Sequence, residues 1–261
     1  MLKHITYPIL VISLSLLFGC AAGRPLPVEH ERDGEPVTLE ELADPSAAEL
    51  EPRAEAVLLE FTFRGRDTEL LWAVQKVLKP LETSEIQTEL FKHNCLSAGR
   101  GDSGQLEKLL AVLDSAGARL SKRTNILLFD EDGLAAPIKT CSTEEYINYT
   151  DQNGERVQLR LQNAVLEWYI SVTAAEAQSL KYSIIPRIRK PQSLIEKRYK
   201  IAENTRFDWA GIEGLAQSGG FVVLSPCHWP VAYDDLAEHI FSAGDSQSLR
   251  IFCFVFTKVS Q

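Results

Sequence analysis

The alternation of apolar and polar residues in the second half of the chain is the sequence feature that constrains its fold most strongly. The pattern runs through 157–162, 166–172 and 180–188, where every second residue is apolar. Successive side chains of a strand point to opposite faces, so this period indicates strands with one buried and one solvated face. Such strands are typical of antiparallel sheets. We therefore expect an antiparallel β region here.

Two further segments extend this β region. Residues 144–150 and 156–162 are predicted to form a hairpin around Asn153-Gly154, a dipeptide that favours a tight turn. The last strand, 249–259, carries Ile251, Cys253 and Val255 on one face and three phenylalanines on the other. A strand that is apolar on both faces is expected at the centre of a core, although contact with lipid or a partner is the alternative.

The first half of the folded region has a different period. Residues 57–63 alternate as a strand, and helical spacing follows over about 68–79, 86–94 and 105–116, with Gly117 placed to end the last helix. The predicted fold class is therefore α+β. An N-terminal strand and three helices are followed by a mainly antiparallel β domain.

The N-terminus predicts export and lipid attachment. Lys3 precedes an apolar run over 5–17, which is the order of a secretory signal. The run is shorter than the roughly 20 residues that a membrane-spanning helix needs, and Leu17-Phe18-Gly19-Cys20 resembles a bacterial lipobox. We expect a signal peptide over 1–19 and a lipid on Cys20. An uncleaved N-terminal anchor is the alternative. Ala21 favours the outer membrane, by resemblance to enterobacterial lipoproteins.

Acidic residues and prolines set the next segment apart. Residues 29–55 hold ten acidic residues against two arginines, whereas 56–261 carry a net charge of only −3. A segment with high net charge and little apolar surface cannot offset its ordering entropy, so 20–55 is predicted to be a tether. The chain has no basic stripe of the kind that nucleic-acid binding requires.

From the third helix onward, the predicted elements follow one another in a definite order. They are the helix 106–117, the strand start 120–123, the turn Asp132-Gly133, the Ala-rich strand 134–138, the central pair 166–172 and 180–186, and the closing strands 220–224 and 249–259. This order resembles the C-terminal domain of secretins, the ring-forming outer-membrane proteins of type II and III secretion.

The Val-Pro-x-Gly lip signature of that family is absent, so the resemblance implies a divergent, shortened relative. It divides the folded part into a small α/β subdomain, 56–103, and a secretin-like β domain, 104–261. It also requires the strands of 156–189 and 249–259 to share one antiparallel sheet. Residues 71–99 also resemble, more loosely, uncharacterised lipoproteins of planctomycete-type bacteria.

Four cysteines remain in the mature chain, and extracytoplasmic proteins form disulfides readily. Four cysteines allow three pairings, and spacing does not choose among them; free thiols are the alternative. The candidates are Cys95, Cys141, Cys227 and Cys253.

The remaining chemistry-bearing groups predict no catalytic, cofactor-binding or metal residue. Cys227, His228, His239 and Cys253 form a Cys/His set, but adjacent ligands on a strand point to opposite faces. Ser225, His228 and Asp234 or Asp235 lie close in sequence, yet a Ser-His-Asp site is defined by geometry. Acidic pairs such as Glu144-Glu145 and the turn 130–132 are typical of solvated turns.

The sequence thus predicts a non-enzymatic lipoprotein of the outer membrane that needs no cofactor. Its expected partners are the membrane, through Cys20, and either itself or an envelope protein complex in secretion or transport, with exposed strand edges as the contact. A monomeric ligand- or cell-wall-binding lipoprotein with a groove near Trp209 and Trp229 is the first alternative. A periplasmic hydrolase is the second.

Overall fold

A computed structural model describes residues 52–64, 68–81, 88–129, 133–175, 179–190, 204–229, 231–232, 234–244 and 248–260. These ranges belong to a compact unit that spans Glu49–Gln261. The predicted signal peptide, Cys20 and nearly all of the predicted tether lie outside them. None of the described helices has the length and apolarity to cross a membrane.

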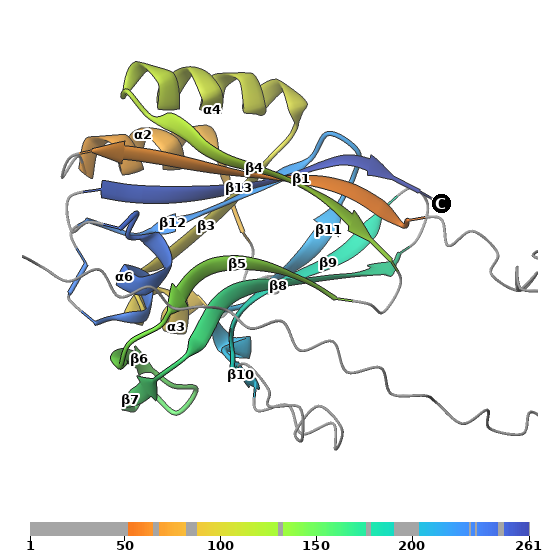
Figure 1. Cartoon of the computed structure of the whole chain (residues 1–261). Helices are drawn as coiled ribbons and strands as arrows, with labels where there is room; N and C mark the ends of the chain where they lie inside the picture. The colour runs from red at the N-terminus through yellow and green to blue at the C-terminus, as the bar shows by residue number, and fades with distance from the viewer. Residues whose placement is uncertain are drawn as a thin grey trace, which may run out of the picture. The chain divides into compact units, whose positions relative to one another are not determined.

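A six-stranded sheet contains both ends of the folded unit (Figure 1). All of its strand pairs are antiparallel. In spatial order, its strands are β2 (Lys79–Pro80), β3 (Leu96–Gly101), β12 (Phe221–Pro226), β13 (Ser248–Val259), β1 (Ala54–Arg64) and β4 (Arg119–Leu128).

A second sheet of five strands and a separate hairpin complete the β structure. The predicted turn at Asn153-Gly154 is confirmed, with Gly154 at a φ of 80° between the paired arms of the hairpin. The five-stranded sheet has the order β10 (Asn204–Arg206), β9 (Leu180–Arg189), β8 (Ala164–Ala174) and β5 (Leu134–Cys141), with β11 (Ile212–Ala216) also on β9; the hairpin is β6 (Glu145–Thr150) and β7 (Arg156–Leu161).

Short helices cover the sheets. Helices α2 (Thr68–Val77) and α4 (Ser103–Ser115) lie against one face of the six-stranded sheet, and the five-stranded sheet lies on its other face (Figure 1). Helix α4 begins with a capping box between Asp102 and Gln105 and ends at Ser115, just before the C-cap Ala116 and Gly117, whose φ is 71°. The described helices are α2 (Thr68–Val77), α3 (Thr88–His93), α4 (Ser103–Ser115), α6 (Leu236–Phe241) and the 3-10 helix η1 (Asp208–Ala210).

The core lies mainly between the two sheets. Trp168 of β8 meets Phe252 and Phe254 of β13 edge to face, at ring-centroid distances of 5.5 and 6.1 Å. Farther along, Tyr182 of β9 packs on Phe256 at 5.3 Å. The expectation that the last strand is central is confirmed, because β13 lies between β12 and β1 and is buried on both faces.

The predicted fold class is wrong. Strand makes up 56% and helix 21% of the described residues, and the four helices lie mostly within the β region. No N-terminal layer of three helices precedes a β domain in the described chain. Strand β1, which comes first in sequence, pairs with β13 and β4 inside the six-stranded sheet. Local periodicity revealed individual elements but not their partners, and the pairing of β1 with β13 joins residues as far apart in sequence as Ala56 and Phe256.

The single sheet that the secretin resemblance requires is also not present. Strands β8 and β9 pair with each other in the five-stranded sheet, β7 pairs with β6, and β13 belongs to the six-stranded sheet. The two larger sheets pack face to face through their side chains, because the apolar faces of β8 and β13 bury each other.

Replacing Phe254 by alanine should open a cavity between the sheets. Phe254 is 1% exposed, and a Phe→Ala change in a core lowers the free energy of unfolding by about 3–5 kcal/mol. Urea unfolding of the purified chain measures the change. The control is Leu215→Ala at a site that is 60% exposed, which should stay within about 0.5 kcal/mol of wild type. Equal effects of the two substitutions would contradict this packing.

Candidate functional site

Two of the predicted cysteines meet at the end of a strand pair. Strands β3 and β12 pair in antiparallel register up to Leu96 opposite Pro226. One residue farther, the amide of Cys227 donates to the carbonyl of Cys95 at 3.0 Å, which continues the ladder. The two Sγ atoms lie 2.9 Å apart. The sheet therefore places these thiols directly opposite each other.

The two thiols differ in acidity because they share a hydrogen bond. The hydrogen bond from Cys95 lowers the pKa of Cys227 to about 7. The same hydrogen bond, together with burial, raises the pKa of Cys95 well above its usual range. Cys227 is half-buried, whereas Cys95 is 7% exposed. Near neutral pH, Cys227 is thus the more reactive and more accessible sulfur.

The other two cysteines lie in different sheets. Cys141 is the last residue of β5, and burial together with the nearby Glu145 raises the pKa of its thiol to about 11. Cys253 lies within β13, where burial raises its pKa to about 12. Both are inaccessible thiols in a protonated state. Cys20 lies outside the described residues.

The Cys/His set considered from sequence does not assemble as a unit. His228 contributes a ring nitrogen beside Cys95 and Cys227, and the three ligand atoms lie within 4.8 Å of one another. His239 instead lies in a separate polar network, and Cys253 is enclosed in the core. Sequence reasoning missed Cys95 as a member, because only strand pairing brings it to Cys227.

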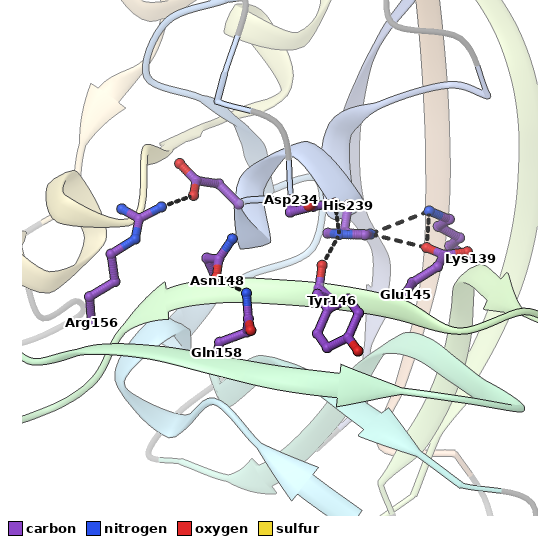
Figure 2. A network of polar contacts seen from close by, with 9 residues as sticks. Lys139, Glu145, Tyr146, Asn148, Arg156, Gln158, Asp234 and His239 are labelled. Carbon is purple, nitrogen blue, oxygen red and sulfur yellow. Dashed lines mark hydrogen bonds and ion pairs between the residues drawn. The ribbon is translucent and has the colours of Figure 1, made fainter.

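The polar network around His239 joins helix α6 to strands β5 and β6 (Figure 2). His239 is 3% exposed, and its Nε2 lies 2.9 Å from the backbone oxygen of Tyr146. Its Nδ1 lies 3.3 Å from Nζ of Lys139. Lys139 also forms an ion pair with Glu145 at 2.6 Å.

These contacts fix the protonation state of the imidazole. The Tyr146 carbonyl can only accept a hydrogen bond, so Nε2 carries the proton. Nδ1 then accepts from the ammonium group of Lys139. Burial, followed by the charge of Lys139, lowers the pKa of His239. A neutral histidine whose two ring nitrogens are both satisfied is a structural connector, not an available base.

Neighbouring contacts extend the same connection to the hairpin. The amide of Asn148 donates to the carbonyl of Asp234, and Asp235 forms an ion pair with Arg156 of β7. Asn148 also accepts a hydrogen bond from Gln158 across the hairpin. The segment before α6 therefore fastens the hairpin to the main body.

Residues of the hydrolase alternative have separate partners. Ser225 is 3% exposed within β12, where it pairs with Ser97. His228 lies beside the sulfur pair, and Asp235 is taken by Arg156. The adjacent carboxylates also have different partners, because Glu144 forms an ion pair with Arg160 and Glu145 forms one with Lys139. The acidic turn 130–132 lies outside the described residues.

The tryptophans of the ligand-binding alternative lie in the core. Trp209 is 8% exposed and stacks on Tyr149 at 5.6 Å. Trp229 is 4% exposed and Trp168 is 2% exposed. Trp209 and Trp229 are therefore too buried to line an open groove. The exposed tryptophan is Trp72 of α2, at 62%.

Among the described strands, the edge strand β4 has the most exposed residues. Among the described strands it pairs only with β1. The side chains of Arg119–Arg123 are all exposed, and Leu120 and Leu127 are each 52% exposed. The strand contains Arg119, Lys122 and Arg123 and no acidic residue. It presents a cationic edge with two apolar side chains.

A cavity opens beside the first residues of β4. Its volume is about 780 Å³, and its lining includes Arg64, Arg119 and Arg250. Arg250 donates to the carbonyls of Ile138 and Ser242 and lies 3.5 Å from Glu60. Arg250 is therefore a structural residue, while exposed Arg64 and Arg119 add positive charge to the rim.

Comparison of the chain with protein-family models, with curated proteins and with solved structures finds no match.

Protonation of His239 should couple to unfolding. Because the pKa of His239 in the folded state lies below the ordinary value of 6.5, the unfolded state binds the proton first as pH falls. The stabilisation is complete above pH 6.5 and is lost toward lower pH. His239→Gln should therefore be less stable than wild type at neutral pH, and the gap should narrow toward about pH 5. Denaturant unfolding across this range measures the gap, with His93→Gln on α3 as the surface control. A gap that widens in acid would contradict a buried neutral imidazole beside Lys139, Glu145, Asp234 and Glu238.

Proposed function

We propose that the chain is an outer-membrane lipoprotein that docks a partner protein and has no enzymatic role. The order of signal, lipobox cysteine and acidic tether supports the anchor at Cys20. The first described strand, β1, begins at Ala54 and so includes the last two residues of the predicted tether. The tether would hold the folded unit away from the bilayer, where its edges are accessible. The likeness to secretins and a role in secretion or transport remain predictions, and the docking proposal does not depend on them.

The open edge of β4 carries this proposal. A strand edge presents unpaired backbone groups that can add a strand from another chain. β4 spans ten residues, which is long enough for an extended peptide to pair along it. Soluble proteins usually shield such edges with short strands or charges. On β4, the charges of Arg119, Lys122 and Arg123 shield the edge from other cationic strands and attract acidic ones.

The occupant that fits this edge is an acidic extended segment of another protein. If two β4 strands paired in the antiparallel register centred on Ser121, Arg119 of one copy would lie opposite Arg123 of the other, and like charges directly opposite each other are destabilising. An acidic strand reverses the sign of those contacts. Leu120 and Leu127 then offer apolar contact for alternate side chains. The arginine-lined cavity beside Arg119 would receive a further carboxylate.

Cys20→Ser should release the protein from membranes. Acyl chains on the cysteine supply the anchoring energy, and the serine variant cannot carry them. Membranes are washed at high salt and the protein is followed by immunoblot in the pellet and the supernatant. Ala21→Ser, next to the modified residue, is the control and should stay in the pellet. Retention of Cys20→Ser in the pellet would disprove the lipid anchor.

Photo-crosslinking tests the β4 edge in cells. Benzoylphenylalanine placed at Leu127 or Leu120 should give a crosslinked species of higher mass. The matched control is the same group at Leu215, which is 60% exposed on β11. The double change Lys122→Glu with Arg123→Glu should reduce the crosslinked fraction at Leu127 at least about tenfold, since like-charge contacts across an interface cost several kcal/mol.

Lys92→Glu on α3, where Lys92 is 65% exposed, should leave the crosslink unchanged. An adduct of twice the chain mass would show self-pairing and would overturn the acidic-partner assignment. Equal crosslinking from Leu215, or indifference to charge reversal, would show that β4 is not the docking edge.

A further inference from the structure

Two thiols, Cys95 just before β3 and Cys227 just after β12, lie close enough to be oxidised to a disulfide, and the docking proposal does not involve them. We propose that Cys95 and Cys227 are a disulfide-forming pair, closed by thiol–disulfide exchange with a disulfide-bearing oxidant outside the cytoplasm. The presence of such an oxidant rests on the proposed extracytoplasmic location. The pairing itself rests on geometry within the folded unit.

Strand pairing positions the two sulfurs before any bond forms. The ladder of β3 and β12 continues to the hydrogen bond from the Cys227 amide to the Cys95 carbonyl. The two residues are thus direct cross-strand neighbours, and their Sγ atoms are 2.9 Å apart. The other cysteines belong to different strands of different sheets. The fold therefore favours a single bond, Cys95–Cys227, and leaves Cys141 and Cys253 apart in their separate sheets.

A metal ion would need a wider arrangement. Zinc–sulfur bonds of about 2.3 Å at tetrahedral angles place two thiolates about 3.8 Å apart. The sulfurs of Cys95 and Cys227 are closer than that. The group that could bind a metal contains, among the described residues, only these two cysteines and His228, one short of the four ligands of a structural zinc site.

The pair lies where several elements meet. Asn94 precedes Cys95, and its side-chain amide donates to the carbonyls of Leu90 and Thr150, both at 2.9 Å. Its side-chain oxygen accepts from the Thr150 amide at 2.7 Å. A bond between Cys95 and Cys227 would therefore tie the end of α3, the start of β3 and the hairpin strand β6 to the end of β12.

The exchange proceeds in two balanced steps. The half-buried Cys227 thiolate attacks one sulfur of the oxidant's disulfide, forms a mixed disulfide and expels the other oxidant sulfur as a thiolate. Cys95 then loses its proton and attacks Sγ of Cys227, which expels the second oxidant sulfur. The two protein thiols are oxidised, the oxidant disulfide is reduced to two thiols, and the two protons end on those thiols. The lowered pKa of Cys227 suits the first step.

Mass spectrometry of the purified full-length chain tests the pairing. The reduced protein is equilibrated in a glutathione buffer as oxidising as the extracytoplasmic space, alkylated after unfolding, and digested. We expect one peptide pair joined through Cys95 and Cys227, with Cys141 and Cys253 alkylated. Oxidation should raise the melting temperature by roughly 5–15 °C. The double variant Cys95→Ser with Cys227→Ser should show no such rise, and Cys141→Ala should retain it.

Several outcomes would overturn the pairing. Cys95 and Cys227 could remain alkylatable in the oxidising buffer, or another pairing could appear. Stoichiometric zinc binding by the reduced protein that is lost in His228→Ala, without disulfide formation in the oxidising buffer, would assign a metal site instead. If the purified protein forms the bond but trapping of cellular thiols finds it reduced, the pairing holds and the extracytoplasmic location fails.

Discussion

Burial of β13 on both faces is the constraint on which the other layers depend. From Ile251 to Phe256 the strand has no charged residue, and each side chain in it is at most 8% exposed. The phenylalanines meet Trp168 and Tyr182 of the five-stranded sheet. Its other face lies on the side covered by α2 and α4 (Figure 1). A strand that is apolar on both sides cannot border water without large cost. β13 therefore needs both covering layers, the five-stranded sheet and the helices α2 and α4. Because these layers bury the two faces of the strand, a partner protein can bind only at the periphery of the unit.

Two kinds of contact connect that periphery to the core. Polar contacts fasten the β6–β7 hairpin, through His239, Asn94 and the backbone of Asp234. Each buried polar group in this set finds a partner, so the contacts specify position without leaving unpaired charge. The Cys95–Cys227 pair lies beside Asn94 and would convert one of these junctions from a hydrogen-bonded to a covalent link. These contacts hold the β6–β7 hairpin in a fixed position against the main body.

The sequence predicted what depends on a residue's neighbours in the chain. Alternation located β8 and β9, Asn153-Gly154 located the hairpin turn, and two-sided apolarity located β13 at the centre. It did not predict the sheet that joins β1 to β13, because pairing over such a separation depends on which apolar faces meet in space. For the same reason, Cys227 could not be assigned a partner. Its position after Pro226 marked a strand end, but only the register with Leu96 identifies Cys95 as the opposite residue.

The two edges of the six-stranded sheet then differ in what they allow. At one edge, β2 has only two residues and β3 begins directly after Cys95, so little free ladder is available. At the other edge, β4 is long, exposed and cationic, and its inward residues Ile126 and Leu128 anchor it firmly in the core. A docking strand needs a template that stays in place while its outer side is free. β4 meets both conditions. The positive charges of Arg119, Lys122 and Arg123 also limit which strands can pair with β4, since positively charged strands are repelled.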